Sequence, residues 1–271
     1  MASTRIQVMS DLHLESPAAY DVFKIDPKAP FLALLGNIGY VKDDGFFLFF
    51  RNQLANFKIV FLILGNHEAY YSSWVEAKAN VKRFQASIDE AIAKGDPLGK
   101  LILLDQTRYD VSSTVTILGC TLFSRIVPAQ MDHVSFGLND FYHIEDWSVK
   151  DHNEAHFGDL TWLNKQVESI SRFEPFRKII VLTHYCPLTS DKVIEPKHAS
   201  SKISSGFMTD LSTQQCWKKE AVKLWIFGHT HSNCDFTDMA TGKGVLSNQR
   251  GYYFAESAGF DVDKVVEIQK S

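Results

Sequence analysis

Residue types that commonly bind metal ions occur in four short segments of this chain. The segments are Asp11-Leu12-His13, Gly65-Asn66-His67-Glu68, Thr183-His184 and Gly228-His229-Thr230-His231. Asp11 and His13 are two residues apart, so on extended backbone they point to the same side and can bind one ion. Carboxylate, imidazole and amide oxygen together suit zinc, manganese or iron, whereas calcium and magnesium prefer oxygen ligands alone. The four segments therefore predict a metal centre.

Each of these segments follows an apolar run that predicts a strand. The runs are short and continuous, as in strands buried on both faces, and they cover residues 6–9, 31–35, 58–64, 178–182 and 222–227. The run at 31–35 leads to Gly36-Asn37, a fifth polar strand end. In open α/β sheets, ligands bind outside the carboxyl ends of the strands. We therefore expect all five strand ends to converge on one site.

Helical patterns separate the predicted strands. Ser73 and Glu76 form a capping-box pattern, and apolar residues follow at helical spacing until the stop signal at 94–97. A second helix is predicted to open at Asp151, and a third to span residues 46–57. The core face of the second helix is expected to carry Phe157, Leu160, Leu163, Val167 and Ile170.

Further strands are predicted at residues 101–109, 115–123, 251–255 and 262–268, which makes two stacked sheets with helices outside plausible. Residues 189–215 are polar and weakly periodic, and they follow directly on the predicted site. A long loop there is expected to act as a lid or a substrate-binding segment.

Length and composition narrow the class of protein. The 271 residues fit one large α/β domain, 1–271. Lys and Arg are scattered and the net charge is −4, so we expect no nucleic acid partner. The longest apolar runs fall far short of the roughly 20 residues that a membrane span needs, so no membrane partner is expected. The four cysteines form no Cys-x-x-Cys pair, and with no signal-like N-terminus they favour a cytoplasmic protein.

The ordered motifs, from Asp11 to His231, resemble those of the calcineurin-like metallophosphoesterases. This resemblance implies an α/β fold, a four-layer α/β/β/α sandwich of two mixed β-sheets, with two divalent or trivalent metal ions (manganese, iron or zinc) between the sheets. The resemblance implies that one ion is bound by Asp11, His13 and His231. The other ion would be bound by Asn66, His184 and His229, and Asn37 would lie between the two ions. Residues 141–147 and 204–210 match none of the family's motifs and are expected to shape substrate choice.

Two bound ions would dictate the chemistry. Paired metals about 3.5–4 Å apart clamp an in-line displacement and lower the pKa of a bound water, which predicts hydrolysis of a phosphoric ester by metal-bound hydroxide. The resemblance makes His67 the catalytic residue, which either protonates the leaving group or stabilises the transition state; protonation of the leaving group is worth about 10²–10⁴ in rate. Glu68 either orients His67 or is exposed. The expected substrate is a small-molecule phosphate ester, either a monoester or a diester.

Asn37 departs from the family's pattern, which has Asp at that position. A carboxylate bridges two cations with a full charge and two oxygens, whereas an amide offers one neutral oxygen and an NH₂ group. We therefore predict weaker binding of one ion and impaired turnover. An engineered substitution, a natural variation and loss of catalysis are the three explanations. The alternative functions are hydrolysis of a different bond and binding of a ligand without turnover.

Overall fold

The computed structural model describes residues 3–198 and 200–269, and its strands form two large sheets. The first sheet has the order β13 (Val265–Gln269), β1 (Ser3–Met9), β2 (Phe31–Leu35), β3 (Ile59–Ile63), β4 (Lys100–Leu103). The second has the order β5 (Thr107–Asp110), β6 (Val115–Cys120), β7 (Lys178–Thr183), β8 (Val222–Phe227), β10 (Gly244–Ser247), β9 (Cys234–Thr237). Both contain parallel and antiparallel pairs, which confirms the prediction of two mixed sheets.

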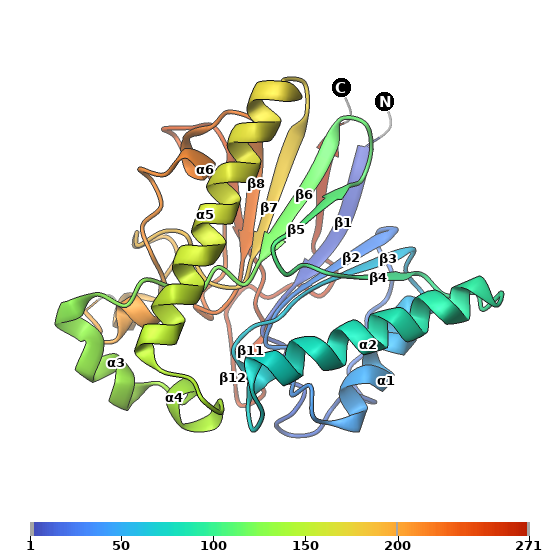
Figure 1. The fold of residues 1–271 in the computed structure, drawn as a ribbon, viewed down its shortest axis with the longest axis horizontal. Coiled ribbons are helices and arrows are strands. Elements are labelled where there is room, and N and C mark those ends of the chain that lie inside the picture. Colours follow the sequence, from blue (N-terminus) through green and yellow to red (C-terminus); the bar gives the residue numbers. More distant parts are fainter. Residues whose placement is uncertain (1–2, 199, 270–271) are drawn as a thin grey trace.

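Helices cover the outer faces of the two sheets (Figure 1). The α-helices are α1 (Asp44–Leu54), α2 (Trp74–Ala93), α3 (Met131–Gly137), α4 (Asp140–His143), α5 (Val149–Phe173) and α6 (Gln215–Lys218). Single 3₁₀ turns span His67–Ala69, Pro128–Gln130, Pro196–His198 and Ser204–Gly206. In Figure 1, α1 and α2 lie beside the first sheet and α5 runs along the second, so the predicted layers are confirmed.

The central strands are apolar throughout because both of their faces are buried. On β2, Ala33 and Leu35 face the layer between the sheets, together with Ile180 and Leu182 of β7. The alternate residues of β2 join a second core under the helices, which includes Phe46 of α1. Side chains alternate across a strand, so one apolar run supplies both layers. The packing therefore holds the carboxyl ends of the strands in fixed positions.

Two of the predicted strands are wrong in extent. Residues 101–109 form two strands, because the chain turns at Gln106 (φ 49°) and crosses from β4 in one sheet to β5 in the other. The strand predicted at 115–123 ends at Cys120, since Leu122 and Phe123 both have positive φ. A third prediction, at 251–255, becomes a hairpin of two-residue strands, β11 (Gly251–Tyr252) and β12 (Ala255–Glu256).

Helix α5 begins earlier than predicted, and one of its expected core residues is exposed. Its N-cap is Ser148, which forms a capping box with Asp151. Phe157 is 71% exposed, so its predicted place on the core face is wrong. The buried positions of the first turns are polar instead. His156 Nδ1 donates to the carbonyl of Leu122, and the N–H of Leu122 donates to the Asp159 carboxylate.

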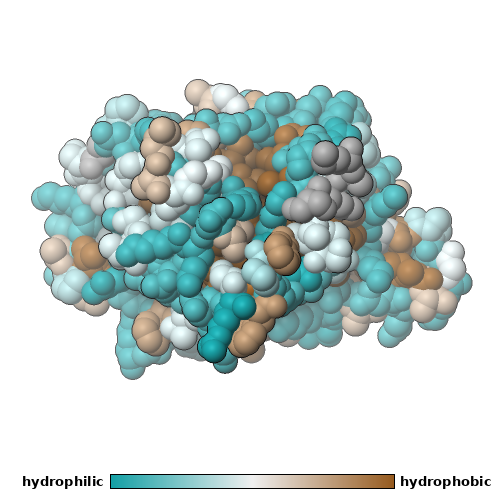
Figure 2. Space-filling view, turned by 90° about the horizontal axis from the view of Figure 1, so that it is seen from above, coloured by the Kyte–Doolittle hydropathy of each residue, from teal (hydrophilic) through white to brown (hydrophobic). Residues whose placement is uncertain are grey.

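The described residues of 189–214 contain two 3₁₀ turns, an isolated β-bridge at Met208 and otherwise irregular backbone, as predicted for a loop, and Gln215 begins α6. The four cysteines are free. Among the residues that the structure describes, no helix is long and apolar enough to cross a membrane. Figure 2 views the protein from above, where a mostly hydrophilic surface surrounds a small apolar hollow. This face lies away from the β11–β12 hairpin, which is at the lower edge of Figure 1.

Candidate metal centre

The seven predicted ligands stand on the turns that follow β1, β2, β3, β7 and β8. Five of them have left-handed backbone, with φ between 47° and 73°: Asp11, His13, Asn37, His229 and His231. Non-glycine residues rarely adopt this conformation, and it persists only where the surrounding structure imposes it. The strand ends therefore hold these side chains in a strained arrangement that is common at functional sites.

Asp11, His13 and His231 form the first ligand group. The Nε2 atoms of His13 and His231 lie 3.1 Å apart, and His231 Nε2 is 3.4 Å from Asp11 Oδ1. The Nδ1 atom of His13 is 3.1 Å from the Glu15 carboxylate and donates to it, which leaves a lone pair on Nε2. Burial lowers the pKa of His13 to about 4, so this imidazole is neutral at pH 7. The three facing atoms therefore suit a cation.

Asn66, His184 and His229 form the second group. His184 Nδ1 donates to the Leu35 carbonyl over 2.7 Å, so its Nε2 turns a lone pair toward Asn66 Oδ1, 3.3 Å away. Both ring nitrogens of His229 are buried without a hydrogen-bond partner among the described residues. Burial also lowers the pKa of His184 and His229, which favours the neutral form that binds metal. These donors likewise fit a metal ion.

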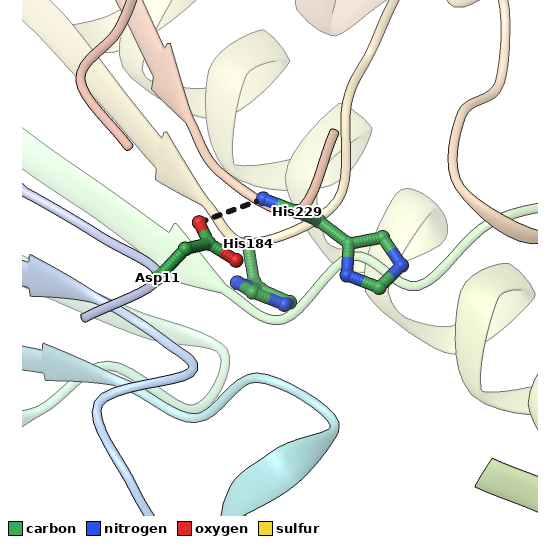
Figure 3. Close-up of side chains that lie close together, drawn as sticks. All are labelled: Asp11, His184 and His229. Carbon is green, nitrogen blue, oxygen red and sulfur yellow. Dashed lines mark hydrogen bonds between the residues drawn. The ribbon is translucent and has the colours of Figure 1, made fainter. Parts of the chain in front are cut away.

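Asp11 belongs to both groups. Its ligand atoms lie within 4.8 Å of those of His184 and His229 as well as those of His13 and His231. Figure 3 shows its carboxylate beside the His184 ring, with the backbone N–H of His229 donating to it over 2.9 Å. Burial acts to raise the pKa of Asp11, but the hydrogen bond from His231 and the neighbouring histidines hold it well below its usual range. The carboxylate is thus charged at neutral pH.

Asn37 lies between the groups. Its Nδ2 donates to Asp11 Oδ1 over 3.2 Å, and its Oδ1 accepts from the backbone N–H of His67 over 3.1 Å. Gly65 makes this close approach possible, because a Cβ atom there would stand 2.4 Å from Asn37 Oδ1 and 2.6 Å from His184 Nε2. The structure therefore brings together all seven predicted ligands around one site.

The sequence matches the calcineurin-like phosphoesterase family over residues 4–233. The chain belongs to this family. A relative, an uncharacterized protein of Acanthamoeba polyphaga mimivirus, is 26% identical over 96% of this chain and 98% of its own length. Family membership and the candidate ligand groups together support metal-dependent hydrolysis of phosphoric esters.

Two solved structures share the fold of this calcineurin-like phosphoesterase. A phosphopantetheinyl hydrolase from Mycobacterium tuberculosis has a TM-score of 0.64 at 13% identity, over 93% of this chain and 90% of the other. A dimetal phosphatase from Danio rerio has a TM-score of 0.51 at 11% identity, over 90% of this chain and 86% of the other. At these identities the likeness concerns the fold alone.

Glu68 of the phosphoesterase takes neither of its two predicted roles. It is fully buried, and its carboxylate accepts from the backbone N–H groups of Asn37 (2.9 Å), Ile38 (2.7 Å) and Gly65 (2.7 Å). Burial raises its pKa to about 7 against the effect of these three hydrogen bonds. Glu68 therefore joins the turns after β2 and β3, which carry Asn37 and Asn66.

Replacing Glu68 with Gln is expected to destabilise the fold by about 1–3 kcal/mol, because the new NH₂ group must face at least one buried N–H donor. Urea unfolding followed by circular dichroism measures the change. The exposed Glu145→Gln substitution is the matched control and should leave the midpoint unchanged. An unchanged midpoint for Glu68→Gln would contradict this role for the carboxylate.

Glu15 is a site residue that the sequence reasoning missed. Its Oε1 atom accepts from Nδ1 of His13 and also from Nδ1 of His67, 2.9 Å away. Burial acts to raise its pKa, but the hydrogen bonds from the two histidines lower it to about 2. The signal was the alternation of Asp11, His13 and Glu15, which places three polar side chains at every second residue of one segment.

Asp140 is the second residue that was missed, and it orients Asn66. The Asn66 Nδ2 atom donates to Asp140 Oδ1 over 2.7 Å, and the Tyr70 hydroxyl donates to the same oxygen over 2.7 Å. Since Asp140 accepts and cannot offer a proton when ionised, the amide NH₂ points to it and Oδ1 points to His184. No local motif marks Asp140, because α4 reaches the site only through the tertiary fold.

Proposed function

We propose that this protein hydrolyses a small-molecule phosphoric ester at a centre of two metal ions. The proposed ligands of one ion are Asp11, His13 and His231. Those of the other ion are Asn66, His184 and His229, and Asn37 lies between the two groups. The observation that carries this proposal is the orientation of the imidazoles. His13 and His184 donate through Nδ1 to protein acceptors, so their Nε2 lone pairs point into the site, and neither ring nitrogen of His229 has a hydrogen-bond partner among the described residues. A metal ion would satisfy these lone pairs together.

When bound, the ions would activate water and neutralise charge on the phosphoryl oxygens. His67 is the proposed proton donor to the leaving group. Its Nδ1 is held by Glu15, it is only 8% exposed, and its ring lines the cavity beside the ligand groups. Nε2 is therefore the ring nitrogen left to meet the substrate. Tyr70 stacks on the same ring at 4.3 Å between centroids, which supports its orientation.

The remaining predictions complete the proposal. We propose that residues 1–271 act as one domain and that the 189–215 segment contacts the substrate, since several of its side chains line the cavity. A cytoplasmic location, the absence of nucleic acid and membrane partners, and the choice of manganese, iron or zinc stay predictions. Asn37 is the observation that favours the second candidate, a protein that binds a ligand in the same cleft with little or no turnover.

Metal removal tests the proposed activity. Protein stripped with a chelator should hydrolyse neither nitrophenyl monoesters nor nitrophenyl diesters, and added manganese, zinc or iron should restore hydrolysis of at least one class. His229→Ala should abolish restoration, whereas His133→Ala, which removes an exposed imidazole of α3, should not affect it. If neither the metal-replenished protein nor its Asn37→Asp form hydrolyses any ester, the binding function is favoured instead.

A further inference from the structure

The cavity beside the candidate metal centre has two unlike walls. Its volume is about 330 Å³, at the lower end of the range for small-molecule sites. One wall consists of candidate ligands and His67. A second wall, the apolar wall, carries Leu138, Ile194, Ile203, Phe207 and Met208, and Phe207 stacks on His229 at 5.0 Å between ring centroids. A substrate with its phosphoryl group at the histidines would therefore lay its organic group against apolar side chains.

Close packing between two distant segments builds the apolar wall. A Cβ atom on Gly206 would stand 2.5 Å from a methyl of Leu138, and one on Gly137 would stand 3.1 Å from Ile203. Behind them, the side chain of Gln130 accepts from the backbone N–H of Ser205 over 2.8 Å. The end of α3 and the 189–215 segment thus meet without a gap, and the wall is a packed part of the fold.

The charged and polar side chains of the cavity bear on whether a second anionic group could bind there. Within the part of the chain that the structure describes, no lysine or arginine lines it, and its one carboxylate, Asp140, is occupied by Asn66 and Tyr70. Arg125 does not line the cavity; it lines a neighbouring groove, which shares Ile194, Ser204 and Met208 with the cavity. Arg250 pairs with Glu256 and donates to the Leu12 carbonyl. Outside the candidate metal centre, the polar lining includes Asn139, His198, Ser201 and Ser204, so among the described residues a second phosphate would find no lysine or arginine there to offset the loss of its hydration.

We infer that the substrate is a phosphoric ester whose organic group is uncharged and largely apolar, bound against Leu138, Ile203 and Phe207. This inference rests on the proposed function, because the phosphoryl group is placed at the candidate metal centre. It disfavours nucleotide-like substrates that carry further phosphates. It also gives a role to residues 204–210, which match no motif of the family: Phe207 and Met208 contribute apolar surface.

Binding of alkylphosphonates tests the inference without requiring turnover. The probes are methyl-, butyl- and hexylphosphonate, titrated calorimetrically into the manganese-loaded protein, and 1,6-hexanebisphosphonate. Full burial of one methylene contributes up to about 0.8 kcal/mol, so even partial burial should make hexylphosphonate bind about tenfold or more tightly than methylphosphonate. The bisphosphonate should lose that gain. Equal affinities along the series, tighter binding of the bisphosphonate, or no binding at all would overturn the inference.

Substitutions in the apolar wall test whether the alkyl chain binds there. Phe207→Ala should reduce the ratio of hexyl to methyl affinity several-fold, and Ile203→Lys should shift preference toward the bisphosphonate. Phe136→Ala is the matched control, because Phe136 is 78% exposed on α3 and lies outside the cavity. A circular dichroism spectrum confirms that each variant is folded. Hydrolysis of methyl nitrophenyl phosphate, measured separately, reports on the proposed function, so a flat chain-length series with active enzyme contradicts only the present inference.

Discussion

Asn37→Asp is expected to tighten the binding of the weaker metal ion by about 100-fold or more and to raise the rate of ester hydrolysis with it. Even residues that only support a ligand change metal affinity by about 10–100-fold, and a charged group between two cations acts on them directly. Asn37 Oδ1 is at present engaged by the backbone N–H of His67, and its Nδ2 by Asp11. The amide thus contributes no charge where two positive ions would repel each other.

In metal-free protein, the same substitution should lower the thermal stability. Asn37 Nδ2 donates to Asp11 Oδ1 over 3.2 Å, so a second carboxylate there replaces a hydrogen bond with like-charge repulsion in a buried site. We therefore expect the apo form of Asn37→Asp to melt at a lower temperature than the unaltered apo protein. Saturating manganese should reverse this order, since a ligand stabilises the folded state by a free energy that grows with the logarithm of its affinity.

Metal analysis and thermal melts of the two forms, with and without manganese, measure both effects. Asn52→Asp is the control, because it adds the same charge at an exposed position of α1. Full and equal occupancy of both sites in the two forms would contradict the prediction. So would an unchanged order of melting temperatures on metal addition.

The strand ends could be predicted from sequence because their pattern is local. Apolar runs buried on both faces, each followed by Asp11, Asn37, His184 or another polar residue, identify a sheet edge without any knowledge of what packs on it. The glycines at these ends were informative for a physical reason. Gly65 leaves no room for a Cβ atom beside Asn37 and His184. The convergence of the strand ends follows from this pattern, whereas the four-layer sandwich and the assignment of ligands to each ion came from the resemblance to the family.

The residues that support the ligands could not be predicted in the same way. Asp140 stands 74 positions after Asn66, and only the path of the chain between β6 and α5 brings the two side chains together. The role of Glu68 was missed because its partners are backbone N–H groups, which leave no mark on the sequence. Phe157 was misplaced since polar contacts to residues 122–124 turn the neighbouring face of α5 inward.

Glu15→Gln is expected to lower kcat by about 10²-fold for an ester with an alkyl leaving group. The buried Glu15 carboxylate accepts from Nδ1 of both His13 and His67 through one oxygen. A glutamine oxygen could accept from both histidines, but the substitution removes the negative charge that the two imidazoles face. It also buries an NH₂ group where Glu15 Oε2 has no hydrogen-bond partner among the described residues. Small displacements of a catalytic group cost rate steeply, and a lost proton donor costs about 10²–10⁴.

A comparison of two leaving groups distinguishes the two roles of Glu15, which are to act through His67 and to orient His13. An alkoxide needs a proton as it departs, whereas nitrophenolate is stable without one, so the loss should be much smaller for a nitrophenyl ester if Glu15 acts through His67. If Glu15 acts mainly by orienting His13, metal content falls and both esters lose rate equally. Steady-state kinetics on alkyl and nitrophenyl esters of one phosphate, with metal measured on the same samples and Glu145→Gln as the control, decides between them. Equal rates for Glu15→Gln and the unaltered protein on the alkyl ester would remove Glu15 from the mechanism.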